Sequence, residues 1–300
     1  MKLPERVKIV EVSPRDGLQN EQLTVPTSAK LEYIDQLVGA GLQVVEVTSW
    51  VPASRIPQLA DHAEVIAGLK STRHKSQLAV LVPNLYGAQQ AVAAGATSLS
   101  VMASASEQFS MKNNNCTIEE GLARCADIVE FAKAENISVR GYLSCTLGCP
   151  YEGQVRLSRV VEVARKLYAL GCGELALSDT IGVGTPAQVQ QMIRGVSAEV
   201  PVEHLAVHFH DSYGQALVNI FAALQLGVRT VDSSVAGLGG CPYARGATGN
   251  VASEDLLYML DGLGIETGVD LERLVAAGRY ICWVLQKTTN SKVGRVLTEG

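Results

Sequence analysis

Short apolar runs rich in β-branched residues recur along this 300-residue chain, and a polar loop and a helical pattern follow each of them. The runs begin roughly 32 residues apart, about the length of one strand–helix unit. They predict eight strands, at residues 7–12, 44–48, 77–82, 98–102, 138–143, 174–178, 206–209 and 230–233. Nearly continuous apolar strands are typical of a parallel sheet that is covered on both faces. Eight units predict a single (β/α)₈ barrel of the TIM type, and the absence of G-x-G-x-x-G after the first strand disfavours an open dinucleotide-binding sheet.

Helix signals lie between the predicted strands. Thr117-Ile-Glu-Glu120 and Thr185-Pro-Ala-Gln188 match the capping-box pattern, and the proline suits the first helical position. A further helix, residues 271–285, is predicted after the eighth unit. No low-complexity tract or Pro/Ser-rich linker divides the chain, so we expect residues 1–300 to form one α/β catalytic domain with this additional C-terminal helix.

Composition limits the partners and the compartment. Hydrophobic residues make up 47% of the chain and charged residues 18%, which suits a large buried core. The formal charge is −5 and there is no long basic run, so neither nucleic acid nor an anionic membrane is expected as a partner. No signal-peptide core, transit segment or apolar stretch of membrane-spanning length is visible, and the seven cysteines fit reduced thiols. These features predict a cytoplasmic location.

Polar side chains stand at the carboxyl ends of five predicted strands. In barrels of this type the active site forms where the strands run into the following loops. We therefore expect the following residues to share one rim: Arg15, Asp16, Glu46, Asp179, the run His208-Phe-His-Asp211 and the loop 237–250.

His208 and His210 are two residues apart on a strand, so both imidazoles point to the same face. With oxygen donors from Asp16 and Asn250 they suit an octahedral Mg²⁺ or Mn²⁺ ion that keeps open positions. Taken alone, an H-x-H pair can also be two hydrogen-bonded histidines on a half-buried strand. The position at the end of an apolar strand, beside an aspartate, favours the metal site. A closed zinc site is disfavoured because only Cys241 lies in these loops.

Arg15 and Cys241 each admit two interpretations. Arg15 could form a structural salt bridge with Asp16, or it could stabilise a developing oxyanion while Asp16 binds the metal. Cys241 could be buried and inert, but the segment 237–249 contains five glycines. That composition favours a reactive thiol on a loop that closes over substrate.

Six segments of the chain resemble signatures of the 3-hydroxy-3-methylglutaryl-CoA lyase family, and the resemblance spans nearly the whole chain. They are residues 12–21 (VSPRDGLQNE), 144–153 (SCTLGCPYEG), 178–185 (SDTIGVGT), 208–215 (HFHDSYGQ), 232–244 (DSSVAGLGGCPYA) and 249–255 (GNVASED). The resemblance implies a divalent-metal cofactor held by Asp16, His208, His210 and Asn250. It also implies catalytic roles for Arg15 as the electrophilic group, for Cys241 as the acid–base residue of the lid, and for the carboxylates Glu46 and Asp179. The general base stays open among Asp16, His208 and Asp179 acting through water.

The implied reaction splits 3-hydroxy-3-methylglutaryl-CoA into acetyl-CoA and acetoacetate, a step of leucine catabolism and ketone-body formation. The chain departs from the family pattern at Gln22, where lysine is usual, at Ser178, where glycine is usual, and across residues 49–55 (SWVPASR), where Ser-Phe-Val-Ser-Pro-Lys is common. Because these departures spare the implied metal and acid–base residues, they bear on acyl specificity. The alternatives are a lyase for a related substrate such as citramalyl-CoA, a condensing synthase and a non-catalytic binding barrel. We expect an acyl-CoA substrate and a homo-oligomer, with the dimer favoured.

Overall fold

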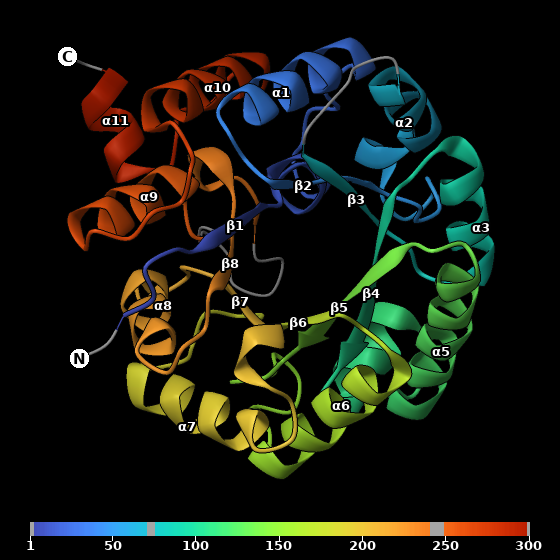
Figure 1. Cartoon of the computed structure of the whole chain (residues 1–300). Helices are drawn as coiled ribbons and strands as arrows, with labels where there is room; N and C mark the ends of the chain where they lie inside the picture. The colour runs from blue at the N-terminus through green and yellow to red at the C-terminus, as the bar shows by residue number, and fades with distance from the viewer. Residues whose placement is uncertain (1–2, 71–75, 241–248, 299–300) are drawn as a thin grey trace.

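The computed structural model describes residues 3–70, 76–240 and 249–298. Eight strands form a closed barrel in which each strand is parallel to its neighbours and β8 returns to β1 (Figure 1). The strands are β1 (Lys8–Glu11), β2 (Val44–Ser49), β3 (Gln77–Leu81), β4 (Ser98–Ser104), β5 (Ser138–Ser144), β6 (Glu174–Asp179), β7 (Leu205–Phe209) and β8 (Thr230–Ser233). All eight predicted strands and the TIM-barrel fold are confirmed.

The strands bury both of their faces, because successive side chains point to opposite sides of a strand. In β5, Val139 and Leu143 belong to the large core between the barrel and the surrounding helices. Tyr142 instead packs inside the barrel with Ala176 of β6 and Ala206 of β7. Positions two residues before and after these interior side chains therefore also face the barrel interior.

Helices surround the barrel, as Figure 1 shows. They are α1 (Thr27–Gly39), α2 (His62–Lys70), α3 (Leu85–Ala94), α4 (Glu107–Phe109), α5 (Ile118–Ala134), α6 (Leu157–Leu170), α7 (Pro186–Ser197), α8 (Ala216–Leu224), α9 (Ser253–Gly262), α10 (Leu271–Val284) and α11 (Lys292–Thr298). Both predicted capping boxes are confirmed, at Thr117 before α5 and at Thr185 before α7. The predicted C-terminal helix is α10, and the short α11 follows it. None of the helices in the described ranges combines the length and the apolar character that crossing a membrane requires.

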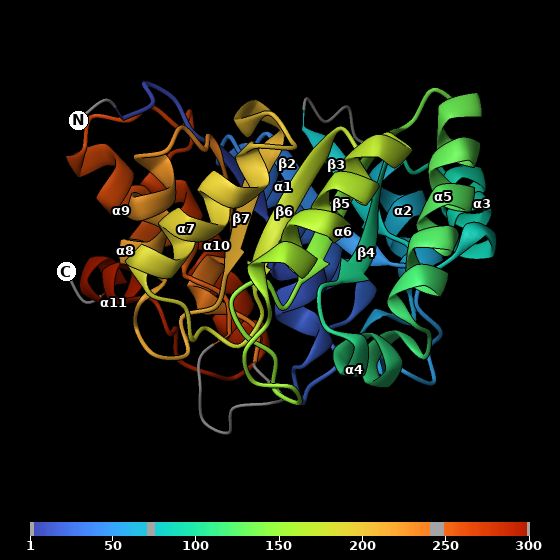
Figure 2. The same ribbon diagram turned by 90° about the horizontal axis from the view of Figure 1, so that it is seen from below.

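Two short helical turns follow the first and last strands at the carboxyl end of the barrel. They are η1 (Ser13–Gly17) after β1 and η5 (Val235–Gly237) after β8. Their close approach requires a glycine, because a Cβ atom on Gly17 would lie 2.9 Å from Leu238 Cβ. Figure 2 places α4, which follows β4, at this same end beyond the strands. Segments that follow different strands thus meet at one rim.

Candidate active site

The four predicted metal ligands meet at the carboxyl end of the barrel. Asp16 lies in η1, His208 lies in β7, and His210 follows that strand. One ligand atom of each lies within 4.8 Å of the other two. Asn250 forms an isolated β-bridge with His210, and its Nδ2 donates a 2.7 Å hydrogen bond to Asp16 Oδ2. The barrel therefore brings these side chains to one point, and their role as ligands remains a prediction.

These side chains fit a divalent cation. His208 turns Nδ1 towards Asp232 and Nε2 towards Asp16, with 3.9 Å between Nε2 and Asp16 Oδ2. His210 Nδ1 is buried and has no hydrogen-bond partner in the described part of the chain. The amide of Asn250 presents its nitrogen to Asp16, and half a turn of this amide would present Oδ1 instead. Two imidazoles and two oxygens leave octahedral positions for water or substrate.

The protonation states of these ligands also favour a cation. Burial raises the pKa of Asp16, but the charge of Arg15, the neighbouring imidazoles and the hydrogen bond from Asn250 outweigh it and lower this pKa to about 2. Burial, together with the neighbouring His208, lowers the pKa of His210 to about 4. Near neutral pH, Asp16 is therefore a carboxylate and His210 a neutral imidazole, which are the forms that bind metals.

Arg15 lies between two carboxylates beside the predicted metal site. Its Nε is 2.5 Å from Glu46 Oε2, and its Nη1 is 2.6 Å from Asp16 Oδ1. Burial lowers the pKa of Arg15, but the charges of Glu46 and Asp16 outweigh this effect and raise the pKa above its usual value. The guanidinium therefore stays charged. Arg15 also lines the cavity described below. The salt-bridge and oxyanion interpretations are thus compatible, because the ion pairs can hold the guanidinium in place for catalysis.

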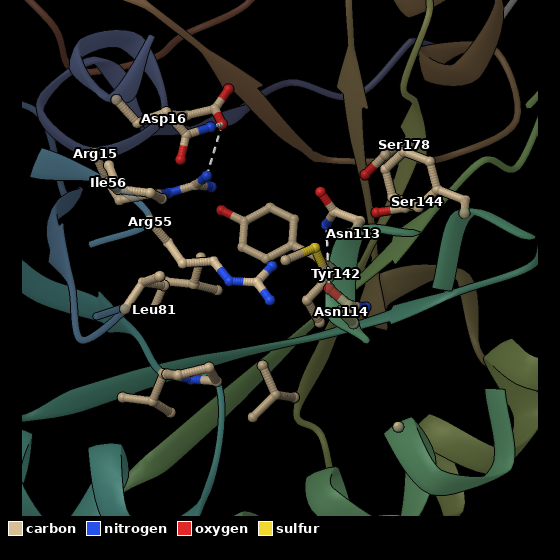
Figure 3. A pocket seen from close by; sticks show the side chains of 18 of the residues that line it. Arg15, Asp16, Arg55, Ile56, Leu81, Asn113, Asn114, Tyr142, Ser144 and Ser178 are labelled. Carbon is tan, nitrogen blue, oxygen red and sulfur yellow. Dashed lines mark hydrogen bonds and ion pairs between the residues drawn. The ribbon is translucent and has the colours of Figure 1, made fainter. Parts of the chain in front are cut away.

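Asp16, Arg15 and the two histidines line a cavity of about 620 Å³. Its wall is partly apolar, and Tyr142 and Leu81 contribute to it. Three cationic side chains also line it: Arg55, Lys112 and Arg124. Figure 3 shows the guanidinium of Arg55 pointing into the cavity, and this side chain forms no ion pair with any described residue. A cavity with these features suits a long ligand that carries negative charge.

The other predicted catalytic residues are placed differently. Glu46 is fully buried and does not itself line the cavity. Asp179 ends β6, and its two oxygens accept backbone hydrogen bonds from Val183 (3.2 Å) and Gly184 (2.8 Å). Its carboxylate therefore supports the turn after β6 and is absent from the described cavity wall. Cys241 lies outside the described residues. Catalytic roles for all three remain predictions.

Three interior residues that contact this site were not predicted: Arg140 and Tyr142 in β5, and Asp232 in β8. Asp232 contacts His208, and the Tyr142 hydroxyl lies 3.3 Å from Glu46 Oε2. One signal was available, since a charged and an aromatic residue two positions apart in a buried strand must share its inner or its outer face. Their partners could not be read from this pattern, because Arg140 and Asp232 are 92 residues apart.

Sequence comparisons identify the protein family to which this chain is similar. The HMGL-like family model matches residues 6–281. The chain is 57% identical over 293 residues to the cytoplasmic 3-hydroxy-3-methylglutaryl-CoA lyase of Rattus norvegicus, covering 98% of this chain and 85% of that protein. It is 56% identical to the mitochondrial hydroxymethylglutaryl-CoA lyase of Gallus gallus, covering 97% and 98% respectively.

A solved structure of a hydroxymethylglutaryl-CoA lyase is also similar to this chain. The crystal structure of hydroxymethylglutaryl-CoA lyase from Pseudomonas aeruginosa has a TM-score of 0.97 and 51% sequence identity, and the match covers 100% of this chain and 99% of that one. The family match, the identity over nearly the whole length and the shared barrel lead to the same conclusion: this chain belongs to the HMGL-like family.

Proposed function

We propose that this protein is a metal-dependent carbon–carbon lyase that cleaves 3-hydroxy-3-methylglutaryl-CoA into acetyl-CoA and acetoacetate. The observation that carries the proposal is the convergence of Asp16, His208 and His210 beside Arg15, in a cavity of a chain whose relatives bear the name of this lyase. Mg²⁺ or Mn²⁺ is the proposed ion, because two imidazoles with carboxylate and amide oxygens suit either one.

The chain's own residues supply the remaining steps of a retro-Claisen cleavage. A bound divalent cation supplies Lewis acidity that lowers the pKa of the tertiary hydroxyl. A base takes the hydroxyl proton, the bond between C2 and C3 breaks, and its electrons move into the thioester to give the enolate of acetyl-CoA. Arg15 donates charge-assisted hydrogen bonds to the enolate oxygen. Cys241 then delivers a proton to C2, and C3 becomes the ketone of acetoacetate.

The base is one of the three groups already named. Asp16 and His208 line the cavity, whereas Asp179 would have to act through water. Glu46 contributes by holding Arg15, to which it is bonded at 2.5 Å. In this proposal Glu46 therefore acts on the reaction through the guanidinium.

Mixing purified protein with 3-hydroxy-3-methylglutaryl-CoA tests the proposal, with acetyl-CoA and acetoacetate measured separately. We expect both products in equal amounts with added Mg²⁺ or Mn²⁺ and neither in the presence of EDTA. Cys241→Ala should keep Mn²⁺ affinity and lose most turnover. A matched series with citramalyl-CoA addresses the alternative substrate, which the changed segment 49–55 makes worth testing. Cleavage of citramalyl-CoA alone would replace the proposed substrate, and no cleavage of either thioester would favour a binding protein.

We further propose a cytoplasmic homodimer that works in leucine catabolism and ketone-body formation. Relatives include both cytoplasmic and mitochondrial forms, so microscopy of the tagged protein in its own cells is the test of location. Large apolar side chains exposed on the last two helices, Trp283 on α10 and Val296 on α11, support self-association. Light scattering should give about 64 kDa, twice the chain mass of 31.9 kDa. A mass near 32 kDa at all concentrations would exclude the dimer.

A further inference from the structure

A layer of ionic side chains fills the barrel interior below the proposed metal site. Arg140 of β5 donates from Nη1 to Asp232 Oδ2 at 2.8 Å and from Nη2 to Asp232 Oδ1 at 2.5 Å. Its Nε donates to Glu174 Oε1 at 2.8 Å, and Glu174 also accepts a 2.6 Å hydrogen bond from Lys8. Arg140 thus forms ion pairs with two carboxylates, those of Asp232 and Glu174.

Only one of these carboxylates contacts the active site. Asp232 is buried and its Oδ2 lies 3.1 Å from His208 Nδ1. A carboxylate that accepts two hydrogen bonds from a guanidinium is ionised and can only accept, so the ring nitrogen facing it must carry the proton. The proton on Nδ1 leaves the lone pair on Nε2, and Nε2 is the nitrogen that faces Asp16.

We propose that Asp232, oriented by Arg140, is a positioning residue that keeps His208 in the Nδ1-protonated tautomer, with Nε2 free for the divalent cation. This inference rests on the proposed function. Carboxylates that accept the second N–H of a metal-binding imidazole fix the ring and raise its affinity for the ion, and losing one typically costs 10–100-fold in affinity.

Arg140 also packs against Tyr142, which leads to Glu46 and Arg15 in the active site. The guanidinium of Arg140 lies 4.9 Å from the centre of the Tyr142 ring, and that ring meets the His208 imidazole edge-on at 5.6 Å. The Tyr142 hydroxyl reaches Glu46, which binds Arg15. Packing around Arg140 therefore restrains the His208 ring as well as the hydrogen bond to Asp232.

The competing explanation is that the pair between Arg140 and Asp232 only stabilises the barrel. A double variant, Arg140→Met with Asp232→Leu, separates the two explanations. Replacing a buried ion pair by apolar side chains of similar size is often neutral or stabilising, so this protein should fold. It nevertheless lacks the acceptor for His208 Nδ1. Glu174→Gln is the matched control, because it removes the other carboxylate of Arg140 and leaves the contact between Asp232 and His208 in place.

The first measurement uses ¹⁵N-histidine-labelled, ion-free protein. The chain has five histidines, so a His208→Gln variant assigns the signal of interest by its disappearance. Long-range ¹H–¹⁵N correlation spectra should show a protonated Nδ1 and an unprotonated Nε2 in the wild type and in Glu174→Gln. The double variant should show a mixture of tautomers. A protonated Nε2 in the wild type would overturn the proposal, whatever the enzyme catalyses.

The second measurement is Mn²⁺ affinity, followed by the electron paramagnetic resonance of the free ion, with Mg²⁺ as competitor. The double variant should bind Mn²⁺ about 10–100-fold more weakly than the wild type. Glu174→Gln should stay within about twofold of the wild type, because its His208 contact is unchanged. An unchanged affinity in the double variant would overturn the positioning role. A wild type that binds neither ion would instead refute the proposed metal site, while the tautomer measurement would still stand.

Discussion

The guanidinium of Arg15 pairs with Glu46 and Asp16 inside a buried site. A lysine there keeps a positive charge between the carboxylates but loses the planar, two-sided hydrogen bonding of arginine. We expect Arg15→Lys to lower kcat about a hundredfold, the scale of one lost oxyanion donor. Arg6→Lys is the control, because Arg6 forms an exposed ion pair with Glu266. If Arg15→Lys lowers the free energy of unfolding enough to account for its loss of activity, the role of Arg15 is purely structural.

Arg55 belongs to the segment in which the chain departs from its family pattern, and it lines the cavity without an ion pair to the described residues. We expect Arg55→Gln to raise KM for the acyl-CoA about tenfold with little change in kcat, the scale of one hydrogen bond to a charged group. Arg55→Lys should recover most of the loss. The same comparison with an acyl-N-acetylcysteamine thioester, which lacks the phosphates of CoA, shows which anion Arg55 binds. A loss that persists there assigns Arg55 to the acyl carboxylate, and a loss confined to the CoA ester assigns it to phosphate. No change with either thioester would remove Arg55 from recognition.

At the scale of elements, the segment that follows β8 passes close to Asn250 at a glycine. Gly239 has a φ of +118°, and a Cβ atom there would lie 2.8 Å from Asn250 Nδ2. Gly239→Ala should displace Asn250 and weaken Mn²⁺ binding by about tenfold or more. Gly240→Ala is the control, since among the residues that the structure describes its Cβ would meet only Asn20, at an ordinary 3.8 Å. Similar Mn²⁺ affinities in the two variants would contradict a role for Gly239 in placing Asn250.

A buried carboxyl group joins α9 to η5. Both oxygens of Glu254 accept the Ala236 N–H, at 2.9 and 3.0 Å. Burial, together with the nearby acidic groups Glu11 and Asp255, raises the pKa of Glu254 from 4.5 to about 8, against the lowering effect of its backbone hydrogen bonds. Because the folded protein holds this proton more tightly than the unfolded chain does, the stabilising contribution is complete below about pH 4.5 and is lost as the pH rises through about 8.

Glu254→Gln, which stays neutral, should therefore flatten this part of the pH profile. Urea unfolding should show that the free energy of unfolding of the wild type falls, relative to the variant, by on the order of 3 kcal/mol as the pH rises from about 5 to about 9. The surface variant Glu266→Gln should keep the wild-type profile, since Glu266 pairs with Arg6 in solvent. Parallel profiles for the wild type and Glu254→Gln would exclude Glu254 as the group responsible.

At the scale of the whole molecule, the barrel closes through the pairing of β1 with β8, its first and last strands. The proposed metal ligands lie on both sides of this seam, because Asp16 follows β1 and Asn250 follows β8. A ligand that binds only the folded state stabilises all of it, so Mn²⁺ at about a hundred times its Kd should raise the free energy of unfolding by about 2.7 kcal/mol. Chemical unfolding with and without EDTA measures the difference. His210→Gln should abolish it, and an equal stabilisation of that variant would point to binding elsewhere.

The proposed single domain is tested in the same unfolding experiment. Loss of helical circular dichroism and loss of tertiary signal should coincide if residues 1–300 unfold as one unit. Two separated transitions would divide the chain.

Local patterns in the sequence were enough for the architecture and for the candidate metal site. Burial of both strand faces, capping boxes and strand spacing are local properties, and they identified every barrel strand. The strand period of two predicts that His208 and His210 share one face. Their meeting with Asp16 followed from a general rule, that strands of a closed parallel barrel end at the same rim.

The tertiary structure alone decided how charges pair inside the barrel. Arg140 and Asp232, Tyr142 and Glu46, and Asp232 and His208 lie on different strands, and only their height in the closed barrel brings them into contact. Barrel height depends on how strands are staggered, and β2 shifts its register against β3 between Glu46 and Thr48. Sequence periodicity determines which face a side chain takes, whereas stagger and closure determine which distant side chain it meets there.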